Sequence, residues 1–281
     1  MPLMSGQALL QRLRKGERFL ADGAMGTQLM RQGVRPERTL NVNSTRPIQI
    51  SAIHHRYLEA GARILSSNTF GTDDPSHWER DFGCGLDLAL HAARSSRENV
   101  AVLISMTTST AQRLVDAHIL PKEWPTGLLV ETCISLKDAM MAAFLLASKQ
   151  PELLAITCHF RADGRMPDGT TPEDAAAALH LAGAHVIGAN CGDDPGRFPE
   201  IAVRMRAVTE LPLLFQPSAG LPQAGANALE GIHYPVTPER FANLAHQLFE
   251  AGVHIVGGCC GTTPAHISAA NQRSLSPRYS S

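Results

Sequence analysis

The chain has 281 residues, of which 44% are hydrophobic, and its 25 basic residues nearly balance its 26 acidic ones. This size allows one large hydrophobic core, and the even charge excludes the basic field that nucleic acid or an anionic membrane would require. No run of about 18 apolar residues and no leader-like apolar segment is present, so neither export nor membrane insertion is expected. Six cysteines are too few for a disulfide scaffold, which favours a cytoplasmic protein acting on a small molecule.

In chain order, predicted strands alternate with predicted helices. Strands are expected in eight places: at 18–22, in ARILSSN ending at Asn68, at 100–105, 128–131 and 153–158, in AHVIGANC ending at Cys191, at 213–215, and in VHIVGGCC ending at Cys260. Helices are expected at 44–60, 83–97, 135–148, 172–183, 196–207 and 237–251. The alternation is typical of parallel strands covered by helices.

Three of these units share one motif, in which a helical pattern ends at Ala-Gly and a short β-branched run follows at once. They are YLEAGARILSSN, LHLAGAHVIGANC and LFEAGVHIVGGCC. Gly61, Gly183 and Gly252 fit the position after each helix, where a positive φ is needed and glycine adopts it without a Cβ penalty. Each unit therefore predicts a helix, a tight loop and a buried strand.

Eight parallel strands in a chain of this length favour a single-domain (β/α)8 TIM-type barrel, although counting alone leaves an open doubly wound sheet as an alternative. Between the third and fourth strands, MTTSTAQRLVDAHILPKEWPTG has room for one short helix, so the third βα unit could be degenerate. The barrel is expected to span residues 1–272. The Ser-rich end, 273–281, is expected to be a flexible tail.

Counting from the glycine of each repeat places Cys191 and Cys260 eight residues on, and Asn68, Asn190 and Cys259 seven residues on. Equal registers place these side chains at the carboxyl rim of a parallel barrel, where such enzymes carry out their chemistry. Adjacent cysteines in a regular strand point to opposite faces, so the strand must turn at 259–260, and the flanking glycines allow this. Three thiolates without a fourth protein ligand match a catalytic zinc site with one open position.

Other interpretations of the cysteines stay open at this point. Cys84, Cys133 and Cys158 are better explained as small core residues. Cys259 and Cys260 could instead form a strained vicinal disulfide or simply pack in the core. Metal analysis decides between these alternatives, because bound zinc should disappear in a Cys191→Ser or Cys260→Ser variant.

Several motifs resemble the homocysteine S-methyltransferase family over nearly the whole chain. They are DGAMGTQL at 22–29, STRPIQISAIHHRYLEAGARILSSNTFGT at 44–72, LLVET at 128–132, ADGRMPDGT at 162–170, GANC at 188–191, SAGLP at 218–222 and GGCCGTTPAHI at 257–267. The resemblance, which extends to the homocysteine-binding module of cobalamin-dependent methionine synthase and to betaine-homocysteine methyltransferase, implies a β/α barrel. It also implies a zinc ion held by Cys191, Cys259 and Cys260.

The same resemblance implies how the substrate binds. Asp22 and Glu131 match the acidic residues that hold the amino group of homocysteine in the family. The backbone amides of the turn formed by Gly23, Ala24, Met25 and Gly26 could receive the substrate carboxylate. Two further candidates lie at strand ends, Asn68 and Asn190, which could orient the substrate or a zinc ligand or could simply satisfy loops.

The activity implied is transfer of a methyl group to a zinc-bound homocysteine thiolate, which gives methionine. The donor is expected from outside the chain: S-methylmethionine, S-adenosylmethionine, betaine or a methylated corrinoid protein. Ser66, Met106-Thr107-Thr108 and Gln216-Pro217-Ser218 depart from the family pattern. The alternatives are therefore a zinc- and thiol-binding module without transfer activity, or methylation of a different small thiol.

Overall fold

The computed structural model describes residues 3–71, 77–116, 125–224 and 232–274. Eight parallel strands form one sheet in the order β1-β10-β7-β6-β5-β4-β3-β2, and a parallel bridge between Ala21 and Ile64 joins its two ends. The ring is therefore closed. Its strands are β1 (Phe19–Leu20), β2 (Ile64–Ser66), β3 (Ala101–Met106), β4 (Gly127–Cys133), β5 (Leu154–Cys158), β6 (Val186–Cys191), β7 (Leu213–Pro217) and β10 (Ile255–Val256).

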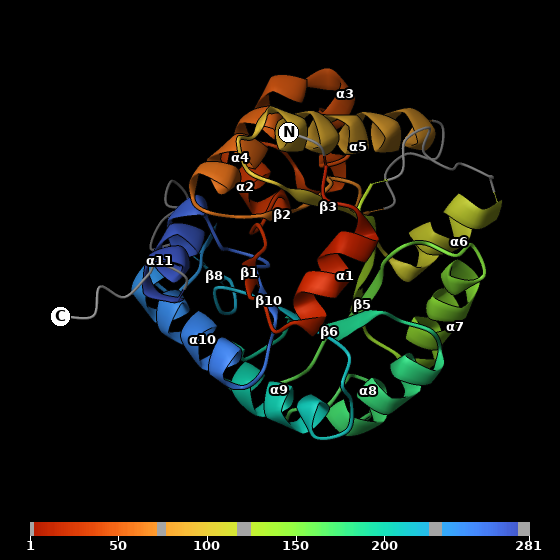
Figure 1. Ribbon diagram of the computed structural model, residues 1–281. Helices are drawn as coiled ribbons and strands as arrows, with labels where there is room; N and C mark the ends of the chain where they lie inside the picture. The colour runs from red at the N-terminus through yellow and green to blue at the C-terminus, as the bar shows by residue number, and fades with distance from the viewer. Residues whose placement is uncertain (1–2, 72–76, 117–124, 225–231, 275–281) are drawn as a thin grey trace.

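Helices surround this ring, as Figure 1 shows. They are α4 (Pro47–Glu59), α5 (Trp78–Ser95), α6 (Thr108–Asp116), α7 (Leu136–Ala147), α8 (Pro172–Leu181), α9 (Phe198–Arg206), α10 (Pro238–Glu250) and α11 (Pro264–Ser274). Shorter elements extend the loops: α2 (Gly26–Arg31), the 3-10 helices Pro36–Arg38 and Pro195–Arg197, α3 (Val42–Thr45), and the hairpin of β8 (Gln223–Ala224) and β9 (Ile232–His233). The (β/α)8 barrel expected from the sequence is confirmed.

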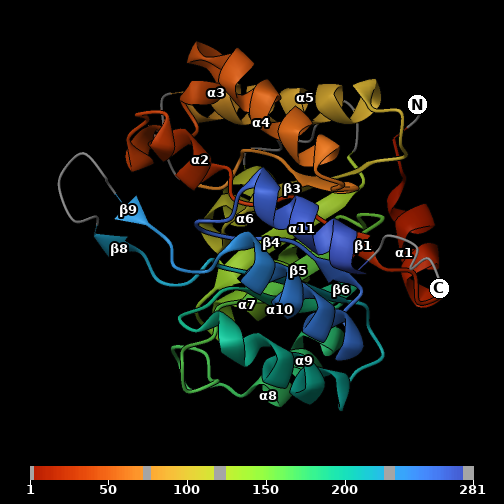
Figure 2. The same cartoon turned by 90° about the vertical axis from the view of Figure 1, so that its left-hand side faces the viewer.

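The strands bury both faces, and alternate residues enter two separate parts of the core. In β3, Ala101 and Leu103 point into the barrel, whereas Val102 and Ile104 pack against the surrounding helices. The inner cluster is completed by α1 (Gly6–Arg14), whose apolar residues Leu9, Leu10 and Leu13 join it. α1 lies across one end of the barrel in Figure 1 and, in the view of Figure 2, opposite the β8–β9 hairpin. One end is therefore plugged, and the carboxyl ends of the strands face the other.

Most expected helices appear within a few residues of their predicted ends, with one break. The helix expected over 44–60 is two helices, α3 and α4, separated at Arg46. Pro47 explains the break, because the residue before a proline is pushed out of the helical region, and Arg46 has φ −140° and ψ 54°. The glycines Gly61, Gly183 and Gly252 have φ of 108°, 90° and 86°, as the motif predicted.

The sequence analysis did not predict α1, α2 or α11. The third βα unit contains a helix of nine residues, α6, and 117–124 of its following loop lie outside the described residues. α11 continues to Ser274, while the expected domain boundary at 272 stays a prediction, and the tail 275–281 is not described. No described helix is both long and apolar enough to cross a membrane.

Candidate metal and substrate site

A cavity of about 330 Å³ opens at the carboxyl ends of the strands. It combines the three cysteines, two carboxylates, small polar side chains and an apolar edge. Its lining residues are Asp22, Gly23, Ala24, Met25, Gly26, Thr27, Met30, Pro36, Thr39, Ser66, Ser67, Asn68, Phe70, Ser105, Glu131, Thr132, Cys191, Gln216, Gly258, Cys259 and Cys260. Every candidate residue named from the sequence lines it except Asn190, which lies behind the wall.

Three sulfurs meet on one side of this cavity. The Cys191 Sγ lies 3.0 Å from the Cys259 Sγ and 3.7 Å from the Cys260 Sγ, and all three sulfurs fall within 4.8 Å of one another. Cys191 ends β6, and Cys259-Cys260 follow β10. The equal register inferred from the glycines therefore places the cysteines side by side, although β7 separates their strands.

The backbone at the cysteines departs from regular strand geometry, as convergence requires. Cys191 has φ of 61°, a left-handed conformation that is uncommon for a residue with a Cβ and that often occurs at functional sites. After β10 the chain turns: a Cβ on Gly258 would lie 2.3 Å from the Thr262 Oγ1, and Gly261 has φ of 81°. The turn thus depends on glycine at both positions.

Negative charge is stabilised at one of the sulfurs. The neighbouring thiols of Cys191 and Cys259 lower the pKa of the Cys260 thiol by hydrogen bonding to its thiolate. The hydrogen bond to Cys191 is in turn the largest cause that raises the pKa of Cys259 well above its ordinary value. The three close sulfurs therefore share protons. A soft cation that bound to all three would displace those protons into solvent.

Asp22 faces the cavity from the end of β1 and is only 3% exposed. Its Oδ2 accepts a hydrogen bond of 2.9 Å from the Ser66 N–H, while Oδ1 has no partner among the described residues. Burial raises the pKa of Asp22 to about 8, and the charge of Glu131 adds to this shift. A buried carboxyl with a free oxygen is suited to a cationic donor entering the cavity.

Glu131 reaches the same cavity from β4. The Ser105 hydroxyl donates to its Oε1, and the Asn190 Nδ2 donates to its Oε2 over 3.2 Å. Burial raises the pKa of Glu131 to about 7. Two carboxyls with raised pKa values therefore face one cavity, and a positive charge placed between them would favour the ionised form of both.

Asn190 lies behind Glu131, fully buried. Its Oδ1 accepts hydrogen bonds from the Thr132 N–H at 2.7 Å and the Thr157 hydroxyl at 2.8 Å. Its Nδ2 lies 2.7 Å from the Thr132 Oγ1 and 3.8 Å from the Cys259 Sγ, in addition to Glu131. Asn190 thus connects the carboxylate side of the cavity to the cysteine side and positions both.

The hydrogen bonds of two candidates bear on the roles considered for them. The Ala24 N–H donates to the Thr262 Oγ1 over 3.0 Å, so it is not free to receive a substrate carboxylate. The Asn68 Nδ2 donates to the Thr39 carbonyl at 2.8 Å and to the Asn43 Oδ1 at 2.7 Å. Asn68 lines the cavity, yet its amide group holds the 39–43 segment rather than a cysteine.

Residues to which the sequence analysis gave no role in binding complete the site. The Tyr57 hydroxyl donates to the Ala24 carbonyl at 2.8 Å, and Thr262 accepts from the Ala24 amide, so both fix the turn after β1. Ser66 and Gln216 line the cavity, and the Ser66 Oγ and Gln216 Oε1 are buried without partners in the described part of the chain. Both residues stand at positions where the sequence departs from the family pattern. That departure was the one sequence feature that could have drawn attention to them.

The remaining cysteines are separate from this site. Cys133 and Cys158 are neighbours across β4 and β5 and are buried in the core. Cys84 lies on α5, partly buried. Among the described residues, the only group of three metal-binding side chains within bonding reach of one ion is Cys191, Cys259 and Cys260.

Comparison with known proteins agrees with this architecture. The methionine synthases of Mycobacterium leprae and Mycobacterium tuberculosis are 30% and 29% identical over 93% and 89% of the chain. The chain spans about a quarter of the length of both, 24% in each case. An S-methylmethionine–homocysteine S-methyltransferase of Pongo abelii is 26% identical over 94% of the chain and 80% of its own length.

Solved structures show the same fold. The apo form of the homocysteine methyltransferase MmuM from Escherichia coli superposes with a TM-score of 0.72, at 23% identity, covering 93% of this chain and 98% of its own. Its metallated form has the same TM-score at 22% identity and covers 94% and 99% of the two chains. The family described as homocysteine S-methyltransferase matches residues 19–274. The chain belongs to the homocysteine S-methyltransferase family.

Proposed function

We propose that the chain transfers a methyl group to the thiol of homocysteine to form methionine, with Zn²⁺ held by Cys191, Cys259 and Cys260. The observation that carries this proposal is the convergence of three sulfurs within 4.8 Å on a cavity that two buried carboxyls also face. Sulfur ligands select a soft cation, and the carboxyls suit the ammonium group of an amino acid. A small thiol that is also an amino acid satisfies both halves of the cavity.

The cysteine geometry fits a zinc ion. Zinc–sulfur bonds of about 2.3 Å at tetrahedral angles place two ligand sulfurs about 3.8 Å apart. The Cys191–Cys260 sulfur distance of 3.7 Å meets this value, and the 3.0 Å between Cys191 and Cys259 requires an opening of under about 1 Å. Three thiolates leave one position for a further ligand, which is the pattern of catalytic rather than structural zinc sites.

When bound, zinc supplies a Lewis acid that keeps a coordinated thiol in its thiolate form at neutral pH, which an alkyl thiol alone does not reach. The protein residues then place the substrate. Asn190 holds Glu131 and approaches Cys259 within one hydrogen-bond network. The spacing between the thiol and the amino group of the substrate is thereby fixed by buried side chains rather than by mobile ones.

Three buried polar atoms at the cavity support binding of an ammonium group. The Asp22 Oδ1, Gln216 Oε1 and Ser66 Oγ have no hydrogen-bond partner in the described part of the chain. An ammonium group offers three donors and one positive charge, so it compensates both the missing hydrogen bonds and the buried carboxyls. The amides of Gly23 and Met25 have no partner among the described residues and remain available for the substrate carboxylate.

The methyl donor has to enter at the open side of the cavity, which Met25, Met30 and Phe70 border, with Phe70 41% exposed. S-methylmethionine, S-adenosylmethionine, betaine and a methylated corrinoid protein all carry a methyl group that a thiolate can attack. We further propose that the barrel is one domain over residues 1–272 and works in the cytoplasm, where free cysteines stay reduced.

The test is turnover with a panel of these donors. Purified protein is incubated with homocysteine and each donor in turn, and methionine is measured. Formation of methionine with at least one donor, lost in Cys191→Ser, supports the proposal. Thiol binding without methionine from any donor would instead indicate a binding module. A Cys84→Ser variant is the matched control, because Cys84 lies on α5 outside the cluster.

A further inference from the structure

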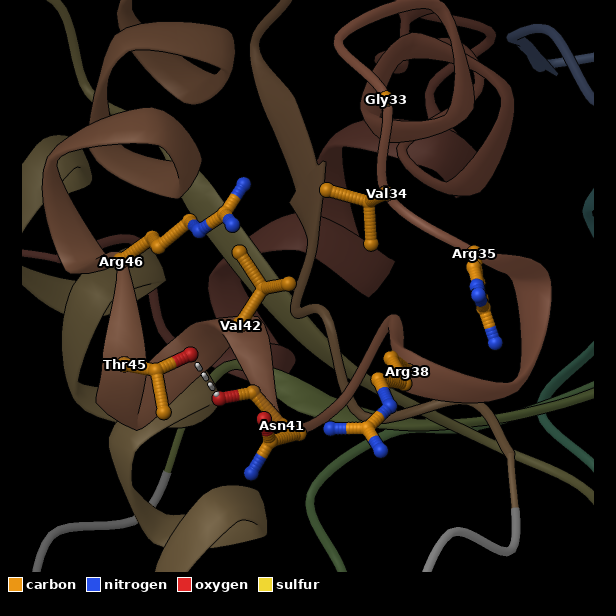
Figure 3. A pocket seen from close by; sticks show the side chains of 8 residues that line it. All are labelled: Gly33, Val34, Arg35, Arg38, Asn41, Val42, Thr45 and Arg46. Carbon is orange, nitrogen blue, oxygen red and sulfur yellow. Dashed lines mark hydrogen bonds between the residues drawn. The ribbon is translucent and has the colours of Figure 1, made fainter.

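Two groups of side chains outside the proposed site lie in loops at the carboxyl ends of the strands. One borders a hollow of about 390 Å³ between α2 and α4. Figure 3 shows the guanidinium groups of Arg35, Arg38 and Arg46 there pointing in different directions, so they do not converge on one anion. The other group is the pair His159 and Asp193, in the loops after β5 and β6. The contacts of this pair converge on the residue that follows Cys191.

Cys191 reaches the cavity through a break in the alternation of its strand. In β6, Val186 points into the barrel, whereas Ile187 and Ala189 pack against the surrounding helices. Regular alternation would point Cys191 to the helix side as well. Instead, Cys191 has φ of 61° and lines the cavity. A strained conformation of this kind persists only where surrounding contacts hold it.

Two neighbouring loops hold the peptide group that joins Cys191 to Gly192. The Ser218 N–H donates to the Cys191 carbonyl at 3.0 Å, and the Ser218 hydroxyl donates to the Gly192 carbonyl at 3.2 Å. The Gly192 N–H donates to the His159 Nδ1 at 3.3 Å. This peptide group is therefore held at its carbonyl by Ser218 and at its N–H by the ring of His159.

The ring of His159 is itself held in one orientation. His159 directly follows β5, and its backbone N–H donates to the Cys133 carbonyl at 2.9 Å. Its Nε2 lies 3.3 Å from the Asp193 Oδ1, and its side chain is 19% exposed. Because Nδ1 accepts the Gly192 N–H, the proton of the neutral ring is on Nε2, the nitrogen that faces the Asp193 carboxylate. Asp193 therefore favours the tautomer that the bond to Gly192 requires.

We propose that His159 is a positioning residue of the cysteine cluster: its Nδ1 holds the peptide group after Cys191 and thereby keeps the Cys191 sulfur beside those of Cys259 and Cys260. As a role in metal binding, the inference rests on the proposed function. The Cys191 Sγ lies 3.0 Å and 3.7 Å from the other two sulfurs. Since zinc–sulfur bonds are about 2.3 Å long, a turn of the Cys191 backbone would remove its sulfur from the metal. His159 is outside the described group of side chains within reach of one ion, so it acts through the backbone.

The test uses two substitutions that each preserve one of the two ring contacts. Asparagine carries a carbonyl oxygen near the position of Nδ1, whereas glutamine carries its amide group near the position of Nε2. His159→Gln should therefore lose the bond to Gly192 and weaken zinc binding about 10–100-fold, measured by competition with a chelator. X-ray absorption at the zinc edge should show fewer than three protein sulfurs in this variant. His159→Asn should restore the zinc affinity and the sulfur count nearly to those of the unaltered chain.

His185→Gln is the matched control. The His185 Nδ1 also accepts a backbone N–H, that of Leu154 at 3.0 Å, but at the opposite, amino end of β6. This variant should bind zinc as tightly as the unaltered chain. Equal zinc affinities of His159→Gln and the unaltered chain would overturn the inference. An equal loss of affinity in His159→Asn or in His185→Gln would also overturn it, because the effect would then not depend on the Nδ1 contact beside Cys191.

A measurement on the metal-free chain separates this inference from the proposed function. Diamide oxidises two neighbouring thiols to a disulfide and takes up their two hydrogen atoms, so its rate of joining Cys191 to Cys259 reports whether the two sulfurs lie together. That rate, followed by mass spectrometry of digested protein, should fall about fivefold or more in His159→Gln, the factor that one hydrogen bond contributes, and not in His159→Asn. An unchanged rate in His159→Gln would overturn the inference. A chain that shows these rates but binds no zinc would refute the proposed function and support the positioning role.

Discussion

The buried carboxyl of Asp22 allows a quantitative prediction of how the stability of the metal-free, substrate-free protein depends on pH. Its pKa is raised from 3.8 to about 8 by burial. The folded chain therefore keeps a proton on Asp22 at pH values where the unfolded chain has lost it. Stability from this group is fully present below about pH 4 and is lost as the pH rises through about 8. Asp22→Asn, which cannot ionise, should remove that loss.

The magnitude follows from the size of the shift. One pKa unit corresponds to about 1.4 kcal/mol, so a shift from 3.8 to about 8 sets an upper limit of about 6 kcal/mol. The free energy of unfolding of Asp22→Asn, relative to the unaltered chain, should therefore increase by several kcal/mol between pH 4 and pH 9. Most of the increase should fall between pH 5 and pH 8.

The assay is urea unfolding of chelator-treated protein at each pH. The quantity compared is the difference in free energy of unfolding between Asp22→Asn and the unaltered chain. The difference is required because other groups act in the opposite direction. Burial lowers the pKa of His54 to about 4, so stability from His54 is lost as the pH falls below about 6.5. Asp87→Asn, at an exposed position on α5, is the matched control. A pH-independent difference between Asp22→Asn and the unaltered chain would refute the reasoning.

Three other substitutions test the site. Asn190→Ala removes a buried side chain that forms hydrogen bonds with Thr132, Thr157 and Glu131. Urea unfolding should show that the free energy of unfolding falls by about 2–4 kcal/mol, and calorimetry should show weaker homocysteine binding. Unchanged values of both would contradict the role of Asn190. Gly258→Ala places a Cβ 2.3 Å from the Thr262 Oγ1, so zinc content by elemental analysis should fall, whereas Gly83→Ala meets no atom within 4 Å and should retain it. Cys260→Ser should reduce zinc content to near zero, and full retention would contradict the ligand assignment.

Much of the fold could be predicted because its sequence signals are local. The Ala-Gly units specified helix ends and strand starts, and the equal spacing from Gly183 and Gly252 placed Cys191 and Cys260 at one height. Convergence of the cysteines then required only a turn, which the glycines at 257, 258 and 261 made possible. The structure places these sulfurs within 4.8 Å of one another.

The parts that could not be predicted depend on contacts between distant segments. The plugging of the barrel by α1 arises from packing of Leu9 and Leu13 against inward-facing strand residues, and a short amphipathic helix carries no sign of where it docks. By register, Asn68 could orient the substrate or a zinc ligand, or satisfy a loop; its amide group forms hydrogen bonds with Thr39 and Asn43. Register determines the height of a side chain at the rim but not the neighbour to which it turns.

The central claim is that Cys191, Cys259 and Cys260 bind one zinc ion with a position open to the substrate thiol. X-ray absorption at the zinc edge, recorded on purified protein before and after addition of homocysteine, tests it directly. The account predicts three sulfur neighbours and one lighter atom before addition, and four sulfurs afterwards. Absence of stoichiometric zinc, or a zinc environment that homocysteine leaves unchanged, would contradict it.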